Sequence, residues 1–466
     1  MAKFNTTGVT PAKGAGFIES EKVASGLTHE GAPGYARTAK SELFLLGVSN
    51  FFGEGSFSEN ASDRDERFVA LVREVAVADT DWFGRFVAWL RGEGNIRSAA
   101  LVAALEGADA LREAGVPGGR KIVASALQRA DEPGEALAYW IANHGRKIPQ
   151  PIKRGIADAV VASYNEYSLA KYDSKARGFR FGDVIDLVHP TPRGGAQSSL
   201  FKYALDRRRD AKVDVPSDLT RLQARNEFLA LSRTDLRGLV NSGEAVTRIS
   251  EAGLTWEALS GVIDGGMDAK AWESVIPTMG YMALLRNLRN FEQADVSKSV
   301  LDSVAKRLSD PDEVAKSRQL PMRFLSAYQA TKGSLRFGWA LEQALDASLK
   351  NVPSLKGRTL ILVDRSGSMF HTYSQKSELD FADTAAVFGT ALALRAEKAD
   401  LVEFGTSSKK VNFKKSDSVL PSLSKFNSLG GTSTAAAVRQ HFNGHDRVII
   451  LTDGQAWGGY YGGNPT

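Results

Sequence analysis

Five oxygen-bearing side chains near the end of the chain have the types and spacing of a divalent-metal site. A D-x-S-x-S turn at 364–368 directly follows the apolar run 359–363, and a second apolar run, 448–451, leads into an Asp. A Gly-Gly-Thr-Ser-Thr stretch at 430–434 lies between them. Carboxylates and hydroxyls are hard donors that Mg²⁺ prefers. The candidate ligands are Asp364, Ser366, Ser368, Thr432 and Asp453. Asp, Ser and Gly also form ordinary turns, so only the three pieces together predict the site.

An alternation of strands and helices would position these ligands. We expect strands at 359–363, 399–404 and 447–452 and helices at 379–396 and 434–442. Alternation of this kind predicts a parallel, doubly wound sheet, which places ligand sites at the carboxyl ends of its strands. The glycine-rich tail after residue 456 reads as a loop, so we expect an α/β domain that is truncated at its C-terminus.

The preceding 350 residues have the pattern of successive amphipathic helices. Phe68, Leu71, Val72 and Val75 follow the i, i+3, i+4, i+7 spacing of a helix with one buried face. Gly- and Pro-containing breaks recur roughly every 15 to 25 residues in the first part of the chain, a rhythm typical of paired helices in a HEAT-like repeat. We therefore predict a helical-repeat domain at 1–350 and an α/β domain at 357–466.

Positive charge is concentrated in one part of the helical domain. Residues 145–212 contain 14 Lys and Arg against 7 Asp and Glu, a local charge of +7, whereas the whole chain has a net charge of +5. Residues 357–466 carry only +2. A surface for a polyanionic partner is therefore expected in the helical domain and not around the metal motif.

Composition excludes several other classes of protein. The chain has 43% hydrophobic and 24% charged residues, as soluble globular proteins do, and no Cys. No apolar run reaches the roughly 18 residues of a membrane helix, and the first residues have no secretory signal pattern. We expect a cytoplasmic protein without a membrane partner. Motifs for a phosphate-binding loop, a zinc protease or a nucleophile elbow are absent from the sequence, so an enzyme is not indicated.

The metal motif resembles the metal-ion-dependent adhesion site of von Willebrand factor A domains. The resemblance implies that Asp364, Ser366, Ser368 and Thr432 surround one Mg²⁺ and that Asp453 acts through water. It also implies an open position on the metal that accepts a carboxylate from a partner.

The chain as a whole resembles the TROVE family, which includes the Ro proteins. The likeness lies in Asp183-Val-Ile-Asp-Leu-Val-His-Pro190, in Ala283-Leu-Leu-Arg-Asn-Leu288 and in the join between 339–349 and 358–369. It implies a monomeric ring of helical repeats whose ends an A domain bridges. It further implies Y-like RNA on an outer surface, single-stranded 3′ ends of misfolded RNA in a central hole, and an exoribonuclease partner such as polynucleotide phosphorylase in bacterial relatives.

His189 matches the histidine that the Ro resemblance associates with Y RNA. A His before Pro also ends helices at a solvent-facing surface, so this alternative stays open, as does a merely solvated basic face. The candidate RNA-binding residues are His189, Lys147, Lys153, Arg154, Lys171, Lys175, Arg177 and Arg180. The expected function is RNA quality control or tethering of RNA to a nuclease. The alternative is a metal-dependent protein-binding adhesion or assembly module without an RNA function.

Overall fold

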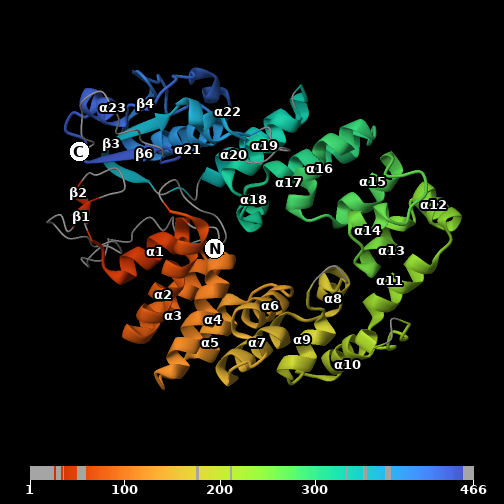
Figure 1. Cartoon of the computed structure of the whole chain (residues 1–466). Helices are drawn as coiled ribbons and strands as arrows, with labels where there is room; N and C mark the ends of the chain where they lie inside the picture. Colours follow the sequence, from red (N-terminus) through yellow and green to blue (C-terminus); the bar gives the residue numbers. More distant parts are fainter. Residues whose placement is uncertain are drawn as a thin grey trace. The chain divides into compact units, whose positions relative to one another are not determined.

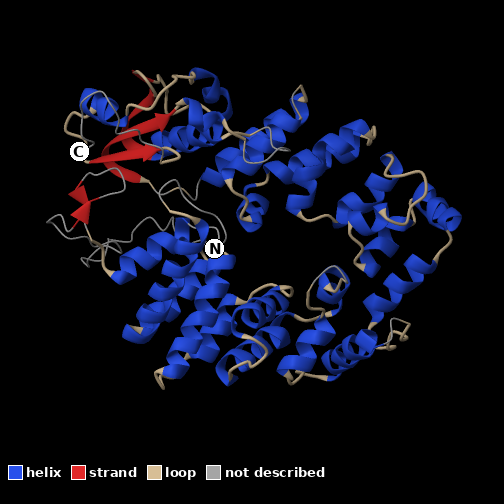
Figure 2. Cartoon of the chain, viewed as in Figure 1, coloured by secondary structure: helices blue, strands red, loops and turns tan. Residues whose placement is uncertain are grey.

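Helices precede a small sheet along the chain (Figures 1 and 2). The computed structural model describes residues 26–27, 33–34, 36–49, 59–174, 178–209, 212–331, 333–349, 352, 354–372 and 379–454. The described residues form two compact units: one holds those from 26 to 236 together with 247–255, and the other holds 237–246 and 256–454. The predicted fold class, helical repeats followed by an α/β domain, is confirmed.

The first unit consists of antiparallel helices and one short strand pair. Its elements are β1 (Gly26–Leu27), β2 (Pro33–Gly34), α1 (Ala39–Ser49), α2 (Ala61–Ala78), α3 (Thr80–Arg91), α4 (Ser98–Glu113), α5 (Gly119–Ala126), α6 (Glu132–His144), α7 (Gln150–Ser163), α8 (Glu166–Tyr172), α9 (Phe181–Val188), α10 (Gly195–Arg209) and α11 (Thr220–Ala230). Helices α12 (Arg233–Ser242) and α13 (Ala245–Ala252) have residues in both units.

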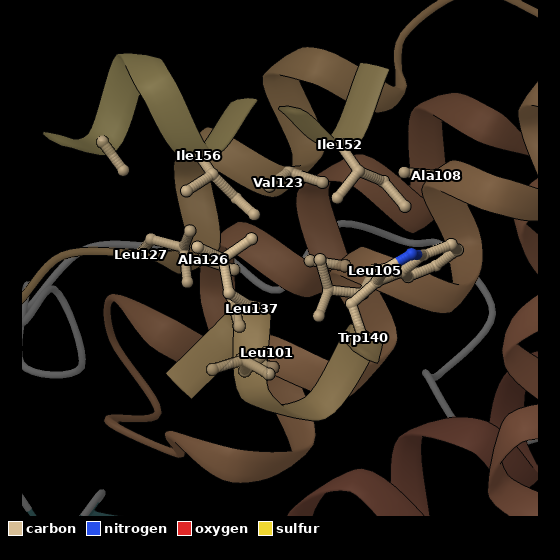
Figure 3. Close-up of a cluster of buried hydrophobic side chains, with 14 of the residues drawn as sticks. Leu101, Leu105, Ala108, Val123, Ala126, Leu127, Leu137, Trp140, Ile152 and Ile156 are labelled. Atoms are coloured by element: carbon tan, nitrogen blue, oxygen red, sulfur yellow. The ribbon is translucent and has the colours of Figure 1, made fainter. Parts of the chain in front are cut away.

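Helix α4 is the centre of the first unit because it is buried on all sides, from Ala99 to Leu111. Its neighbours α2 and α5 pack on opposite parts of it, and α7 in turn packs on α5. Side chains of α4 to α7 interdigitate in one apolar cluster (Figure 3). Gly155 permits the close approach of α7 to α5, since a Cβ there would lie 2.6 Å from the Cβ of Val123. The helices therefore lie in a continuous core that holds their ends at fixed positions.

The second unit combines the remaining helices with a sheet. Its elements are α14 (Trp256–Ser260), α15 (Ala269–Val275), α16 (Tyr281–Gln293), α17 (Lys298–Ser309), α18 (Pro311–Ser317), α19 (Pro321–Ala330), α20 (Leu335–Ser348), β3 (Leu355–Asp364), α21 (Phe381–Arg395), β4 (Ala396–Phe404), β5 (Ser408–Lys410), α22 (Val419–Ser422), α23 (Thr434–His441) and β6 (Arg447–Leu451). The helix α19 packs on α21, and Gln329 Nε2 donates to Asp383 Oδ2 at 3.1 Å. This unit thus spans the predicted domain boundary at 350–357.

The sheet has the strand order β5-β4-β3-β6. Strand β3 pairs in parallel with β4 and β6, with Ile361 opposite Leu401 and Ile449, as the alternating pattern predicts. The short strand β5 differs from the prediction of a parallel sheet, since it pairs with β4 in the antiparallel direction. Only three residues separate β4 from β5, which is enough for a hairpin and too few for a crossover.

Both faces of the central strand β3 are covered. Ile361 and Val363 pack in the cluster that contains α21, and Leu360 and Leu362 pack in the cluster that contains Ala437 of α23. A strand buried on both faces reads as an unbroken apolar run, which is why 359–363 is recognisable in the sequence. Within the described part of the chain, no helix has the length and apolarity to cross a membrane.

Candidate functional site

The first candidate site lies where β3 and β6 end. Asp364, the last residue of β3, is fully buried, and its Oδ1 accepts a hydrogen bond from the backbone N–H of Ser366 at 2.8 Å. Its Oδ2 accepts a hydrogen bond from the hydroxyl of Thr452 at 2.7 Å. The hydroxyls of Ser366 and Ser368 lie 3.3 Å apart. The carboxylate of the D-x-S-x-S turn is therefore held by the Ser366 backbone and by Thr452, and the two serine hydroxyls of the turn lie next to each other.

Backbone hydrogen bonds attach the loop of Thr432 to this turn. The N–H of Gly367 donates to Gly430 O at 2.6 Å, and the N–H of Leu429 donates to Arg365 O at 2.9 Å. Asp453 follows Thr452 and is half-buried. The structure thus brings the loops of all five candidate ligands together.

The donor set of these loops fits a small hard cation only if the hydroxyls take part. Among the described residues, no group of three or more His, Asp or Glu side chains has the arrangement of a metal site. Two carboxylates and three hydroxyls are oxygen donors of the type that Mg²⁺ accepts. Metal binding stays a prediction for these five residues.

Two residues of this site were not predicted from the sequence. Thr452, which directly follows β6, donates its hydroxyl to Asp364. In the sequence it could have been recognised as a hydroxyl beside Asp453 at the end of a predicted strand. Arg365, inside the motif, is 6% exposed, and its Nε donates to Asn427 O at 2.9 Å. Burial lowers the pKa of Arg365, and the nearby Asp383, Asp380 and Glu403 act in the opposite direction. Nothing in the sequence distinguishes this arginine from a solvated one.

The second candidate site is a pocket of about 530 Å³ among α5, α7 and the end of α9. The exposed His189 ends α9 in the left-handed region, with φ 50° and ψ 59°. His189 and Arg154 of α7 both line this pocket. The lining residues are Arg120, Arg154, Ala157, Asp158, Val161, Val188, His189, Pro190, Thr191 and Arg193. Of the predicted RNA-binding residues, Arg154 and His189 meet in this pocket.

Two arginines of this pocket were not predicted. Arg193 lies in the segment that follows His189, and Arg120 starts α5. Arg120 makes a bidentate ion pair with Asp158, with N–O distances of 2.7 and 2.8 Å. The charge excess of 145–212 includes Arg193, but Arg120 lies outside that stretch and only the fold brings it there.

The other predicted cations that the structure describes are not among the lining residues of the pocket. Lys147 is exposed in the turn before α7, and Lys153 is half-buried in the first turn of α7. Lys171 lies 5.5 Å from the ring centre of Tyr167 and 5.2 Å from that of Tyr172. Arg180 is ion-paired with Asp173 at 2.7 Å, so its charge is already compensated. Lys175 and Arg177 lie outside the described residues.

Comparisons with known proteins support the resemblance found in the sequence. Residues 216–336 match the model of the TROVE domain. The "RNA-binding protein RO60" of Deinococcus radiodurans is 25% identical over 95% of this chain and 86% of that protein. The crystal structure of the Deinococcus radiodurans Ro protein has a TM-score of 0.65 at 21% identity, covering 91% of this chain and 87% of that one. The prediction that the chain is not an enzyme agrees with a relative that is named for RNA binding. Residues 216–336 thus match the TROVE domain, and the chain is similar to Ro proteins over nearly its whole length.

Proposed function

We propose that this protein binds RNA, with the pocket of Arg154, His189 and Arg193 as a phosphate-contacting surface. The observation that supports it most is the convergence of these side chains from α7, the end of α9 and the following segment. Arginine forks match phosphate oxygens, and an exposed His can donate to them. Its Deinococcus relative is named an RNA-binding protein, and the similarity extends over 95% of this chain.

We further propose which RNA the protein binds and how that RNA is used. A small structured RNA of the Y type lies along the basic helix ends, and single-stranded 3′ ends of misfolded RNA are held elsewhere on the helical repeats. An exoribonuclease such as polynucleotide phosphorylase then receives the bound RNA for quality control. The supporting argument is the concentration of positive charge at 145–212, which attracts polyanions.

We also propose that Mg²⁺ binds among Asp364, Ser366, Ser368, Thr432 and Asp453. Bound there, the ion would offer an open coordination position to an acidic side chain of a partner. This supplies the second candidate function, a metal-dependent protein-binding module. It is favoured by one observation: separate loops are hydrogen-bonded to one another around the buried Asp364.

The RNA proposal is tested with the double variant Arg154→Ala, Arg193→Ala. Fluorescence anisotropy with a labelled small structured RNA should show weaker binding at low salt. The slope of log K against log[salt] should become shallower by about 0.7–0.9 for each phosphate that the variant no longer neutralises. Lys398→Ala with Lys409→Ala removes the same charge from exposed positions on the sheet and should change little. Equal effects of the two double variants would refute a local RNA site.

The metal proposal is tested by calorimetric titration of Mg²⁺ into the wild-type protein and into Asp364→Asn. The wild type should bind one equivalent, and the variant should lose binding, because the substitution removes a charged oxygen ligand from the centre of the site. Thr452→Val is a useful companion, since it removes the hydrogen bond to Asp364 without removing a proposed ligand. Binding that survives in Asp364→Asn would place the ion elsewhere.

A further inference from the structure

A second cavity in the helical region has features of a ligand site. It has a volume of about 650 Å³ and lies among α8, α10, α11 and the segment 212–215. One part of its wall is apolar and includes Leu169, Val213, Val215 and Leu222. Another part carries the guanidinium groups of Arg207 and Arg225. The size is that of pockets that hold small organic ligands.

Among the described residues, no acid compensates the charge of Arg225. It is half-buried on α11, and within the described ranges it forms no hydrogen bond and no ion pair. Burial lowers its pKa, and the positive charge of Arg207 lowers it further. Burying a cation without a partner is unfavourable, and a neighbouring like charge adds to the cost. An anion in the cavity would relieve both effects.

The buried carboxylate in the cavity lining, that of Asp173, is already used by other donors. Asp173 accepts from Arg180 Nη2 at 2.7 Å, from Arg207 Nη1 at 3.3 Å and from the N–H of Phe181 at 2.9 Å. The other acids of the lining, Asp214 and Glu227, are exposed, so water screens their charges. The donors of Arg225 therefore stay available to a ligand inside the cavity.

We propose that this cavity binds the phosphate of a nucleotide, with Arg225 as its main donor and the apolar wall against the base or ribose. A guanidinium fork pairs with two oxygens of one phosphate, and the second guanidinium of Arg207 favours an anion with several oxygens. The phosphate belongs either to a free nucleotide or to a residue of an RNA chain. In the second case the inference rests on the proposed RNA-binding function.

The test uses the full chain with Arg225→Gln, which keeps a polar side chain that can donate hydrogen bonds and removes the charge. Arg221→Gln is the matched control, because Arg221 lies one turn away on α11 and does not line the cavity. Arg225→Lys keeps the charge and should retain part of the binding. One arm measures AMP and inorganic phosphate by calorimetry, and the other measures a labelled single-stranded RNA by anisotropy. Arg225→Gln should weaken the true ligand by about tenfold or more, the size of a lost charge-assisted hydrogen bond.

The two arms identify the source of the phosphate. A loss confined to AMP supports a free nucleotide, and a loss confined to RNA supports a residue of the chain. The inference is overturned if Arg225→Gln matches Arg221→Gln in both arms. Arg154→Ala, Arg193→Ala in the same RNA assay keeps the proposed function separate. Weakened RNA binding by that double variant, with unchanged binding of AMP, phosphate and RNA by Arg225→Gln, would reject this cavity and keep the RNA site.

Discussion

Two groups of arginines in the helical region differ in how their charge is used. Around the start of α6, Arg91 is 8% exposed and is bound to the fully buried Glu132. In the pocket at the end of α9, no acid partner of Arg154 or Arg193 is found among the described residues. The number of basic residues in a segment is therefore a poor guide to its attraction for polyanions. Acids from distant helices neutralise some of these residues and leave others available.

The buried ion-pair group around Glu132 and Asp131 connects several helices. Glu132 accepts from Arg91 Nη2 at 2.7 Å and from the backbone N–H groups of Gln128 and Arg129 at 2.7 and 2.9 Å. Its neighbour Asp131 accepts from Arg97 Nη2 at 3.2 Å and from Arg129 Nε at 2.6 Å. These bonds link α3, the start of α4 and the start of α6. The charges of the arginines in this group are therefore compensated by acids that connect these helices.

The largest effect is expected from breaking the buried group. Glu132→Gln leaves Arg91 buried without a charged partner and should lower the free energy of unfolding by about 3–5 kcal/mol, as loss of one partner of a buried pair does. Denaturant unfolding followed by circular dichroism measures it. Asp158→Asn breaks the exposed pair with Arg120, whose side chains are 55% and 40% exposed, and should cost less than about 1 kcal/mol. Similar losses in both variants would contradict the comparison.

The pH dependence of stability should test the same buried ion-pair group through its carboxylate Asp131. Burial raises the pKa of Asp131, but the hydrogen bond from Arg129 and the charges of Arg97 and Arg129 outweigh burial and hold it at about 2. A depressed native pKa stabilises the fold above the unfolded pKa of about 4, and this contribution is lost as pH falls from about 4 to 2. The loss should be on the order of 2 kcal/mol. In Asp131→Asn the stability should depend less on pH over that window, and an unchanged pH profile would contradict the assignment.

A smaller effect should appear when a paired arginine is released. Asp158→Asn frees Arg120 in the wall of the α9 pocket and removes a negative charge, so RNA affinity at low salt should rise roughly threefold to tenfold, on the order of 1 kcal/mol. Anisotropy with the labelled RNA measures the change. Asp302→Asn releases Arg336 from a comparable exposed pair in the other unit and serves as the control. Unchanged or weaker binding by Asp158→Asn would show that Arg120 does not contact RNA.

The smallest effect on RNA binding is expected from the metal site. Asp364→Asn should leave RNA affinity nearly unchanged, because Asp364 is buried among oxygen donors in a part of the chain with little net charge. The measurement is an RNA titration of the folded variant, with and without Mg²⁺. A large loss in both the variant and the metal-free wild type would show that the two sites are coupled.

Periodicity determined most of the fold. The i, i+3, i+4, i+7 spacing of Phe68, Leu71, Val72 and Val75 predicted helix α2, because those side chains fill one face of it. The apolar run before Asp364 became β3, since a central strand of a parallel sheet is buried on both faces. The run before Asp453 became β6, a less buried strand at the end of the strand order. The antiparallel β5 was missed because a three-residue strand carries too little pattern.

Local sequence patterns identify side chains that could bind a ligand, but the folding of distant segments selects which of them come together. The D-x-S-x-S motif identified Asp364, Ser366 and Ser368 as candidate ligands, because a local turn brings such near neighbours together. Arg120 in the α9 pocket, Thr452 on Asp364 and the uncompensated Arg225 carry no local signal. Their surroundings are formed by residues distant in the sequence, which the packing of helices and strands brings together.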